Sequence, residues 1–122
     1  MQQDRPIGPD TESFALDELI ERVDGDEGLI REVLGIFLED APKVLENLRT
    51  SIKGGSPEAV ANAAHTLKGS SANISANRLR EKAYRLEMKA KSGDLADAFP
   101  IYAEIEAEFG ELKDLLNQYL GK

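Results

Sequence analysis

Apolar residues recur along most of the chain at the spacing of an α-helix. Between Leu29 and Leu38 the apolar residues at positions 29, 30, 33, 34, 37 and 38 follow this spacing, which places them on one face of a helix. No stretch alternates apolar and polar residues strictly, and β-branched residues are few, so strands are not expected. The pattern predicts an all-α protein.

Turn residues divide this pattern into helices. A short first helix fits residues 14–23 and ends at Asp24-Gly25. The second begins near Asp26, which suits an N-cap, and its pattern stops at Gly54-Gly55. Pro42 lacks a backbone donor, so a kink or a break is expected just before it.

The third predicted helix has the clearest start. Ser56 suits the N-cap, Pro57 suits the first helical position, and Glu58 complements the helix dipole. This helix is expected to end at about Ser71 or Ala72.

The last two helices are separated by a polar turn. The fourth is expected to start near Ser75 and to end at Ser92-Gly93, and Asp94 is expected to cap the last helix, which reaches about Leu120. Pro100 lies early in this last helix, so its first turns are expected to be kinked or the helix to start later.

Amphipathic helices joined by short turns favour an antiparallel four-helix bundle, here with a short additional N-terminal helix. Residues 13–122 are predicted to form this domain. Residues 1–12 are polar and hold two prolines, which predicts a flexible tail. The predicted core is mostly aliphatic and includes Phe37, Leu45, Leu48, Val60, Leu67, Ile74, Leu79, Leu86, Ile105, Phe109, Leu112 and Leu116.

Composition excludes several classes of site. Without cysteine, the chain has no disulfide, zinc-thiolate site or thiol nucleophile. No apolar run approaches the roughly 20 residues that span a bilayer, and the polar start lacks a signal-peptide hydrophobic stretch. These features predict a cytoplasmic protein that does not insert into membranes. No apolar stripe is left over once the bundle is packed, so a monomer is expected.

Charge is distributed unevenly. The net charge is −8, which argues against nucleic acid as a partner. Residues 65–91 nevertheless hold seven cations and two anions, a local charge of +5 that leaves −13 for the rest. This segment is either a basic patch that steers an acidic partner or an ordinary solvated helix face.

His65 is the only histidine, and the pattern of its helix turns it away from the core. On a helical wheel it lies opposite the stripe that contains Val60 and Leu67. Gly69 falls on the outward side too, although glycine inside a helix costs about 1 kcal/mol relative to alanine. It either serves close helix packing or leaves room for a partner's backbone. The residues at offsets −4, −3, +3, +4 and +7 from His65, which share its face, are Ala61, Asn62, Lys68, Gly69 and Ala72.

Most chemistries available to a lone imidazole are excluded by its neighbours. No His/Cys/Asp/Glu cluster has the spacing of metal ligands. Ser70 and Ser71 point away from His65 on a helix, so they do not form a catalytic triad with it. No glycine-rich phosphate loop is present, so the chain is not expected to bind ATP. What remains is a nucleophile that accepts a group delivered by a partner, and Lys68 is placed to balance the charge of a phosphoryl group.

The segment from His65 to Ile74, His-Thr-Leu-Lys-Gly-Ser-Ser-Ala-Asn-Ile, resembles the signature of histidine-containing phosphotransfer (HPt) domains. The resemblance covers roughly residues 13–120. It includes the first predicted helix, Leu38-Glu39-Asp40-Ala41-Pro42, Ala63-Ala64, Leu86-Glu87 and Ser92-Gly93-Asp94-Leu95.

The resemblance implies a role for each matched position. It makes His65 the phospho-acceptor, Lys68 the cation that stabilises the phosphoryl group, and Gly69 the position where the partner closes in. In some members the position of Glu87 faces the histidine and carries glutamine. An acidic residue there is expected to orient Lys68 or Lys91 instead. The predicted docking surface comprises Ala61, Asn62, Gly69, Ala72, Lys82, Glu87 and Lys91.

One position departs from the family pattern, which has glycine and alanine after the motif where this chain has Ser75-Ala76. We expect the turn to survive with altered geometry. Ser75 is expected to cap the fourth helix, and Asn73 to take the left-handed conformation.

These implications predict a module of a multistep phosphorelay. His65 would accept a phosphoryl group from the aspartyl phosphate of a receiver domain and pass it to another receiver. The expected partners are response-regulator receiver domains and a hybrid sensor histidine kinase. No cofactor is expected on this chain and no kinase activity, while Mg²⁺ is expected on the receiver.

Two alternatives remain open. In one, the chain is the substrate domain of a chemotaxis-type autokinase, whose phosphoryl donor is ultimately ATP. In the other, it is a non-catalytic helical adaptor, whose function would survive the substitution His65→Gln.

Overall fold

The computed structural model describes residues 13–122, and the tail predicted for residues 1–12 lies outside this range. The described residues contain no strand, which confirms the all-α prediction. Within residues 13–122 five helices follow one another: α1 (Leu16–Arg22), α2 (Glu27–Gly54), α3 (Pro57–Asn73), α4 (Asn77–Lys91) and α5 (Ala98–Leu120).

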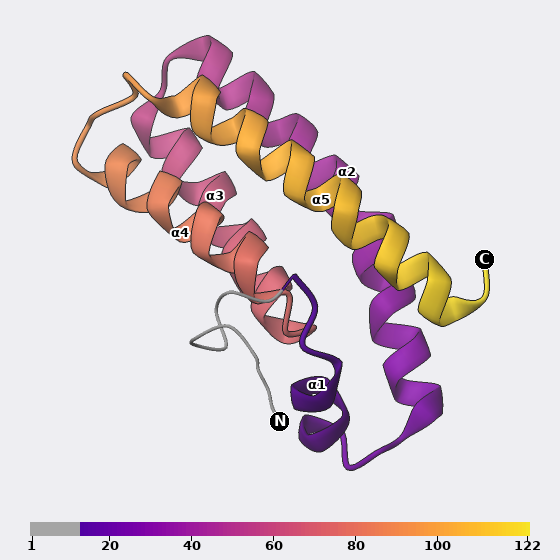
Figure 1. Ribbon diagram of the computed structural model, residues 1–122. Coiled ribbons are helices and arrows are strands. Elements are labelled where there is room, and N and C mark those ends of the chain that lie inside the picture. Colours follow the sequence, from indigo (N-terminus) through magenta and orange to yellow (C-terminus); the bar gives the residue numbers. More distant parts are fainter. Residues whose placement is uncertain (1–12) are drawn as a thin grey trace, which may run out of the picture.

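Helices α2 to α5 form the predicted four-helix bundle. Each packs against two neighbours: α2 against α3 and α5, and α4 against the same two helices from the other side. In Figure 1, α5 runs alongside the long α2, whereas the shorter α3 and α4 lie side by side. The short α1 lies near the start of α2 and packs on that helix. No helix of residues 13–122 is long and apolar enough to cross a membrane.

The core follows the predicted apolar positions. All predicted core residues are buried except Phe109, which is partly buried. Its ring packs against that of Phe37 with 6.1 Å between centroids. The buried residues come from all five helices, so α3 is fixed on both sides by aliphatic packing.

Two helix starts have the predicted caps. Asp26 Oδ1 accepts a hydrogen bond from Leu29 N at 3.0 Å, and Ser56 Oγ accepts one from Ala59 N at 3.2 Å. The cap predicted at Asp94 is wrong. Its carboxylate accepts from Ala96 N in the preceding turn, and α5 begins only at Ala98.

The helix α2 runs through Pro42 without a break. Its axis curves along its length in Figure 1, and the predicted break is absent. Buried residues on both sides of the proline, Phe37 and Ala41 before it and Leu45 after it, keep one face of the helix in the core. Packing of this face outweighs the missing backbone hydrogen bond.

The turn between α3 and α4 survives the replacement of glycine, but not in the predicted way. Ser75 itself takes the left-handed conformation, with φ +59°, while Asn73 remains in α3. Ala76 N donates to Ser71 O at 2.9 Å and Ser75 N to Ala72 O at 3.1 Å. This pair of bonds ends a helix on a left-handed residue at the Ser75 position. Because Ser75 is used in this way, Ala76 occupies the N-cap of α4 and no side chain caps that helix.

Candidate functional site

His65 lies on the solvent side of α3, as its sequence pattern predicts. Its side chain is 66% exposed, whereas the neighbouring Leu67 is fully buried. The imidazole contacts α4, because its Nδ1 lies 2.9 Å from Glu87 Oε2.

Glu87 is a buried carboxylate that collects three nitrogen donors. Its side chain is only 1% exposed. Besides His65, it meets Lys68 Nζ at 2.8 Å from Oε1 and Lys91 Nζ at 3.2 Å from Oε2. Two helices contribute to this group, since α3 carries His65 and Lys68 and α4 carries Glu87 and Lys91. Both lysines named as candidates for orientation by Glu87 are therefore in contact with it.

These contacts set the charge of Glu87. Burial raises the pKa of the carboxyl, but hydrogen bonds from Lys68, His65 and Lys91 outweigh burial and lower the pKa from 4.5 to about 2. At neutral pH the group is therefore ionised and accepts hydrogen bonds only. Nδ1 of His65 must then carry the proton, and in the neutral imidazole Nε2 is left with a free lone pair.

The aromatic ring of Tyr84 was not among the predicted site residues. Lys68 Nζ lies 5.1 Å from the centroid of this ring, and the lysine side chain is 24% exposed. Tyr84 stands three positions before Glu87 on α4, so the two side chains share a helix face. That spacing is the sequence signal that could have found it.

Three of the predicted docking residues do not fit the prediction of an open surface, and the buried Glu87 is one of them. Asn62 and Gly69 are exposed and Ala72 is partly exposed, whereas Ala61 is 8% exposed and belongs to the core. Lys82 turns toward α5 instead, with Nζ 3.4 Å from Glu104 Oε1. Sequence spacing alone does not show which neighbouring helix covers a position.

Gly69 opens onto free space. A Cβ added there would meet no atom within 4 Å, so the explanation of this glycine by close helix packing is wrong. One turn after His65, the backbone of α3 is therefore exposed at Gly69 without a side chain to cover it.

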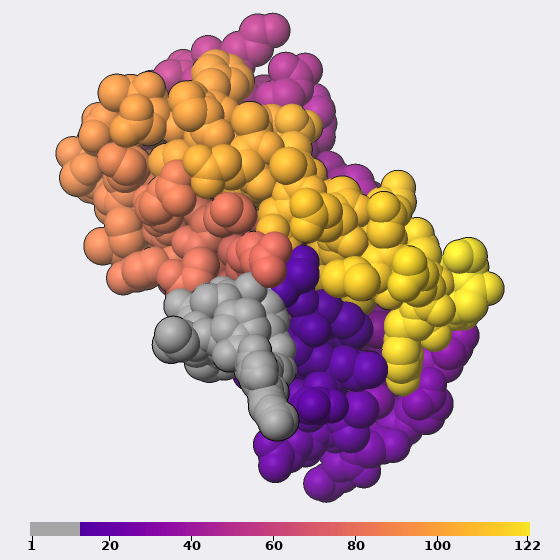
Figure 2. Space-filling model, viewed as in Figure 1, coloured from indigo at the N-terminus to yellow at the C-terminus, as the bar shows by residue number. Residues whose placement is uncertain are grey.

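Most basic residues of α4 pair with acidic residues in α5 or just before it. Arg85 and Lys82 both reach Glu104, at 3.1 and 3.4 Å, and Lys89 reaches Asp97 at 3.4 Å. The hydrogen bond from Arg85 is the largest cause that lowers the pKa of Glu104. Figure 2 shows the face on which side chains of α4 and α5 meet. Of the two explanations for the cationic segment, the solvated, paired helix face is favoured, and the charge at His65 comes from Lys68 and Lys91.

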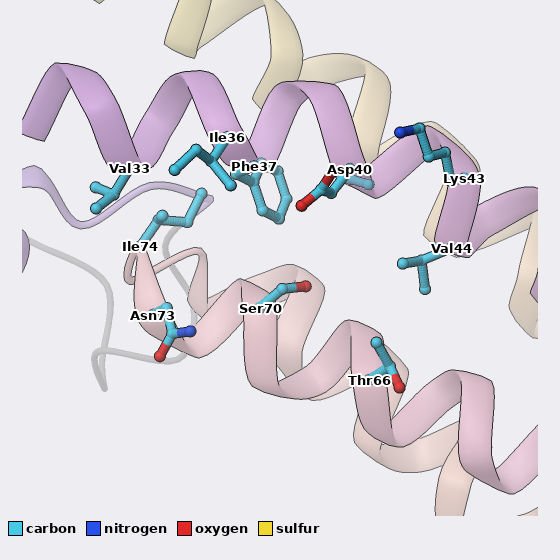
Figure 3. Close-up of a pocket in the computed structure, with 11 residues that line it drawn as sticks. Val33, Ile36, Phe37, Asp40, Lys43, Val44, Thr66, Ser70, Asn73 and Ile74 are labelled. Atoms are coloured by element: carbon cyan, nitrogen blue, oxygen red, sulfur yellow. The ribbon is translucent and has the colours of Figure 1, made fainter.

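A mostly apolar groove of 560 Å³ lies between α2 and α3. Thr66 and Ser70, the sequence neighbours of His65 and Gly69, line one wall, and Ile36, which is 50% exposed, stands on the other (Figure 3). This groove was not predicted from the sequence. Its signal was an isoleucine outside the buried stripe of α2. The other lining residues are Val33, Phe37, Asp40, Ala41, Lys43, Val44, Asn73 and Ile74.

The site combines an exposed imidazole of fixed tautomer, an adjacent ammonium and a buried counter-charge. Within residues 13–122 no group of three or more His, Cys, Asp or Glu side chains is arranged to hold a metal ion. The arrangement suits transfer of an anionic group to Nε2 from a donor that a partner presents.

Comparison with known proteins gives concordant results. The family model of the Hpt domain matches residues 32–120. The histidine-containing phosphotransfer protein B (HptB) from Pseudomonas aeruginosa PAO1 has 26% sequence identity and a TM-score of 0.83, covering 88% of this chain and 93% of that one. The HPT domain of a sensor hybrid histidine kinase from Shewanella shares the fold, with 18% identity, a TM-score of 0.78 and coverage of 89% and 94%. A search of curated proteins found no match.

Proposed function

The chain belongs to the Hpt domain family and is a histidine phosphotransfer module of two-component signalling, and we propose that His65 carries its phosphoryl group. The observation that supports this assignment is the bond between His65 Nδ1 and the buried, ionised Glu87. It leaves Nε2 as the nucleophilic atom on an exposed side chain.

We propose an aspartyl phosphate of a receiver domain as the donor. Nε2 attacks the phosphorus in line, the new N–P bond forms, and the P–O bond to the aspartyl carboxylate breaks, so that the carboxylate leaves with the electron pair. The imidazole gains positive charge as it bonds to phosphorus, and Glu87 stabilises that charge at Nδ1. Lys68, whose ammonium shares the same carboxylate, offsets part of the phosphoryl charge. Mg²⁺ is expected on the receiver, and passage to a second receiver is the reverse reaction.

The receiver docks over the strip of α3 that contains His65 and Gly69 and over the adjoining α2–α3 groove. Gly69 permits close approach, since nothing projects from its backbone. The groove offers apolar surface, with Ile36 half-exposed at its edge. A hybrid sensor histidine kinase is the proposed upstream partner. The cytoplasmic location and the monomeric state stay predictions.

Phosphoryl transfer from a panel of phosphorylated receiver domains tests this function. Wild type and His65→Gln are incubated with each receiver and read by intact mass under neutral conditions. We expect an acid-labile, alkali-stable phosphate on wild type and none on the variant. Labelling by a histidine kinase with ATP, but by no receiver, would favour the autokinase substrate domain. Binding of a receiver without labelling, unchanged in His65→Gln, would favour the adaptor.

A further inference from the structure

The ammonium of Lys68 has two defined neighbours besides solvent. Glu87 Oε1 lies 2.8 Å from Nζ, and the ring centroid of Tyr84 lies 5.1 Å from it. Both neighbours come from one face of α4, three positions apart, while Lys68 comes from α3, three positions after His65. The ammonium therefore sits between the two helices.

These two neighbours cover two sides of the ammonium, and the lysine side chain is still 24% exposed for a ligand. A lysine ammonium carries three N–H donors. The ion pair with Glu87 lies on one side of the ammonium, and the negative face of the Tyr84 ring attracts the cation from another side. Glu87 also binds His65, so the ammonium is held close to the imidazole.

Without the ring, Lys68 would have more freedom. A lysine side chain has several rotatable bonds, and fixing one such chain is entropically unfavourable. The carboxylate alone fixes the end of the chain at one point. The ring adds a second contact that limits how far the ammonium swings toward bulk water.

We propose that Tyr84 is a positioning residue, whose ring keeps the Lys68 ammonium in reach of a phosphoryl group on His65. This proposal rests on the proposed phosphotransfer function. It assigns to Tyr84 no direct contact with the phosphoryl group or the partner, so its whole effect passes through Lys68.

A donor without a protein partner tests this proposal, because it removes docking from the measurement. Potassium phosphoramidate is the probe: Nε2 of His65 bonds to phosphorus, the P–N bond of the donor breaks, and ammonia leaves. The rate of labelling is followed by intact mass in wild type, Tyr84→Phe and Tyr84→Leu. The control is Phe99→Leu, which removes a half-exposed ring on α5. Circular dichroism checks that each variant is folded.

Tyr84→Leu should lower the labelling rate about two- to five-fold, the size of one cation–π contact at a partly exposed site. Tyr84→Phe, which keeps the ring, should be labelled at the wild-type rate, and Phe99→Leu should be labelled at the wild-type rate too. In NMR spectra, the ε-protons of Lys68 should show a ring-current shift in wild type and Tyr84→Phe that is lost in Tyr84→Leu.

A double-mutant cycle decides whether Tyr84 acts through Lys68. In a Lys68→Gln background, Tyr84→Leu should have no further effect on the rate. A full additional loss in that background would overturn the proposal, as would equal rates for wild type and Tyr84→Leu. If wild type itself is labelled no faster than His65→Gln, the proposed function fails and this proposal with it. Normal labelling of His65 without an effect of Tyr84 would overturn the positioning role alone.

Discussion

Glu87 combines near-complete burial with a negative charge, and several properties of the site follow from that combination. Its carboxylate meets His65, Lys68 and Lys91, so it sets the tautomer of the nucleophile and the place of the cations. The sequence analysis predicted that it orients the lysines. The bond to Nδ1 required knowledge of how α4 rotates against α3, which helical spacing within one segment does not contain.

The lowered pKa of Glu87 predicts a pH-dependent contribution to stability. A group whose pKa falls on folding stabilises the protein above its unfolded-state value, here 4.5, and loses this contribution as the pH falls toward about 2. The contribution at neutral pH is at most about 3 kcal/mol. Urea unfolding of wild type and Glu87→Gln between pH 7 and acid should therefore give two stability curves that converge below about pH 4.5. Parallel curves would contradict this.

Gly69 predicts opposite effects on stability and on function. Nothing lies within 4 Å of an added Cβ, so Gly69→Ala should stabilise the folded protein by about 1 kcal/mol through its higher helix propensity. The methyl group should slow transfer from a phosphorylated receiver, because it lies where the partner approaches. Labelling by phosphoramidate serves as the control and should not change. Equal slowing with both donors would show that Gly69 affects His65 itself.

At the level of helices, local signals predicted the elements and tertiary contacts decided their ends. The start of α3 was predictable because Ser56 and Pro57 act within their own turn. Asp94 was mispredicted because its carboxylate finds a donor in the preceding turn, closer in sequence than the helix it was expected to cap. Pro42 does not break α2, since the buried face that continues past it packs against α3 and α5.

Ser75 shows how a distant helix supports an unfavourable turn. Its left-handed backbone costs about 1 kcal/mol or more for a residue with a side chain. In return its hydroxyl accepts a hydrogen bond from Arg22 of α1, at 2.9 Å. The same guanidinium donates to the carbonyls of Ala72 and Asn73 at 2.8 Å, so α1 covers the end of the helix that carries His65.

Two substitutions separate the cost of the strained backbone at Ser75 from the contribution of its hydrogen bond to Arg22. Ser75→Ala keeps the strained backbone and loses the hydrogen bond, so it should destabilise the protein by about 1 kcal/mol. Ser75→Gly loses the same bond but relieves the strain, so it should be more stable than Ser75→Ala by about 1 kcal/mol. Urea unfolding measures both. A Ser75→Ala variant as stable as Ser75→Gly would show that the backbone is not strained.

At the level of the whole molecule, surface properties depend on which helices become neighbours. The cationic segment has the composition of a basic patch, but Glu104 of α5 and Asp97, just before α5, lie against it. The α2–α3 groove arises in the same way, from residues of two helices that are far apart in the sequence. The fold class and the exposure of His65 were predictable because each depends on the pattern within one helix, whereas these surfaces depend on how the helices pack.

We expect the α2–α3 groove to be needed for phosphoryl transfer from a receiver but not for the stability of the fold. Ile36→Glu places a charge at its half-exposed edge and should slow transfer from a receiver by about ten-fold or more, the effect of losing roughly 1.4 kcal/mol of binding. Leu115→Glu, at a 40% exposed position on α5, is the matched control and should transfer normally. The rates are measured with a limiting concentration of the same phosphorylated receiver. Equal rates for both variants would place the docking surface elsewhere.

The most direct test of the account is to identify the atom that carries the phosphoryl group. Long-range ¹H–¹⁵N spectra of the phosphorylated protein, combined with ³¹P coupling, distinguish the two imidazole nitrogens of the single histidine. The bond from Nδ1 to Glu87 predicts phosphorus on Nε2 and a proton retained on Nδ1. Phosphorus on Nδ1, or on any residue other than His65, would contradict it.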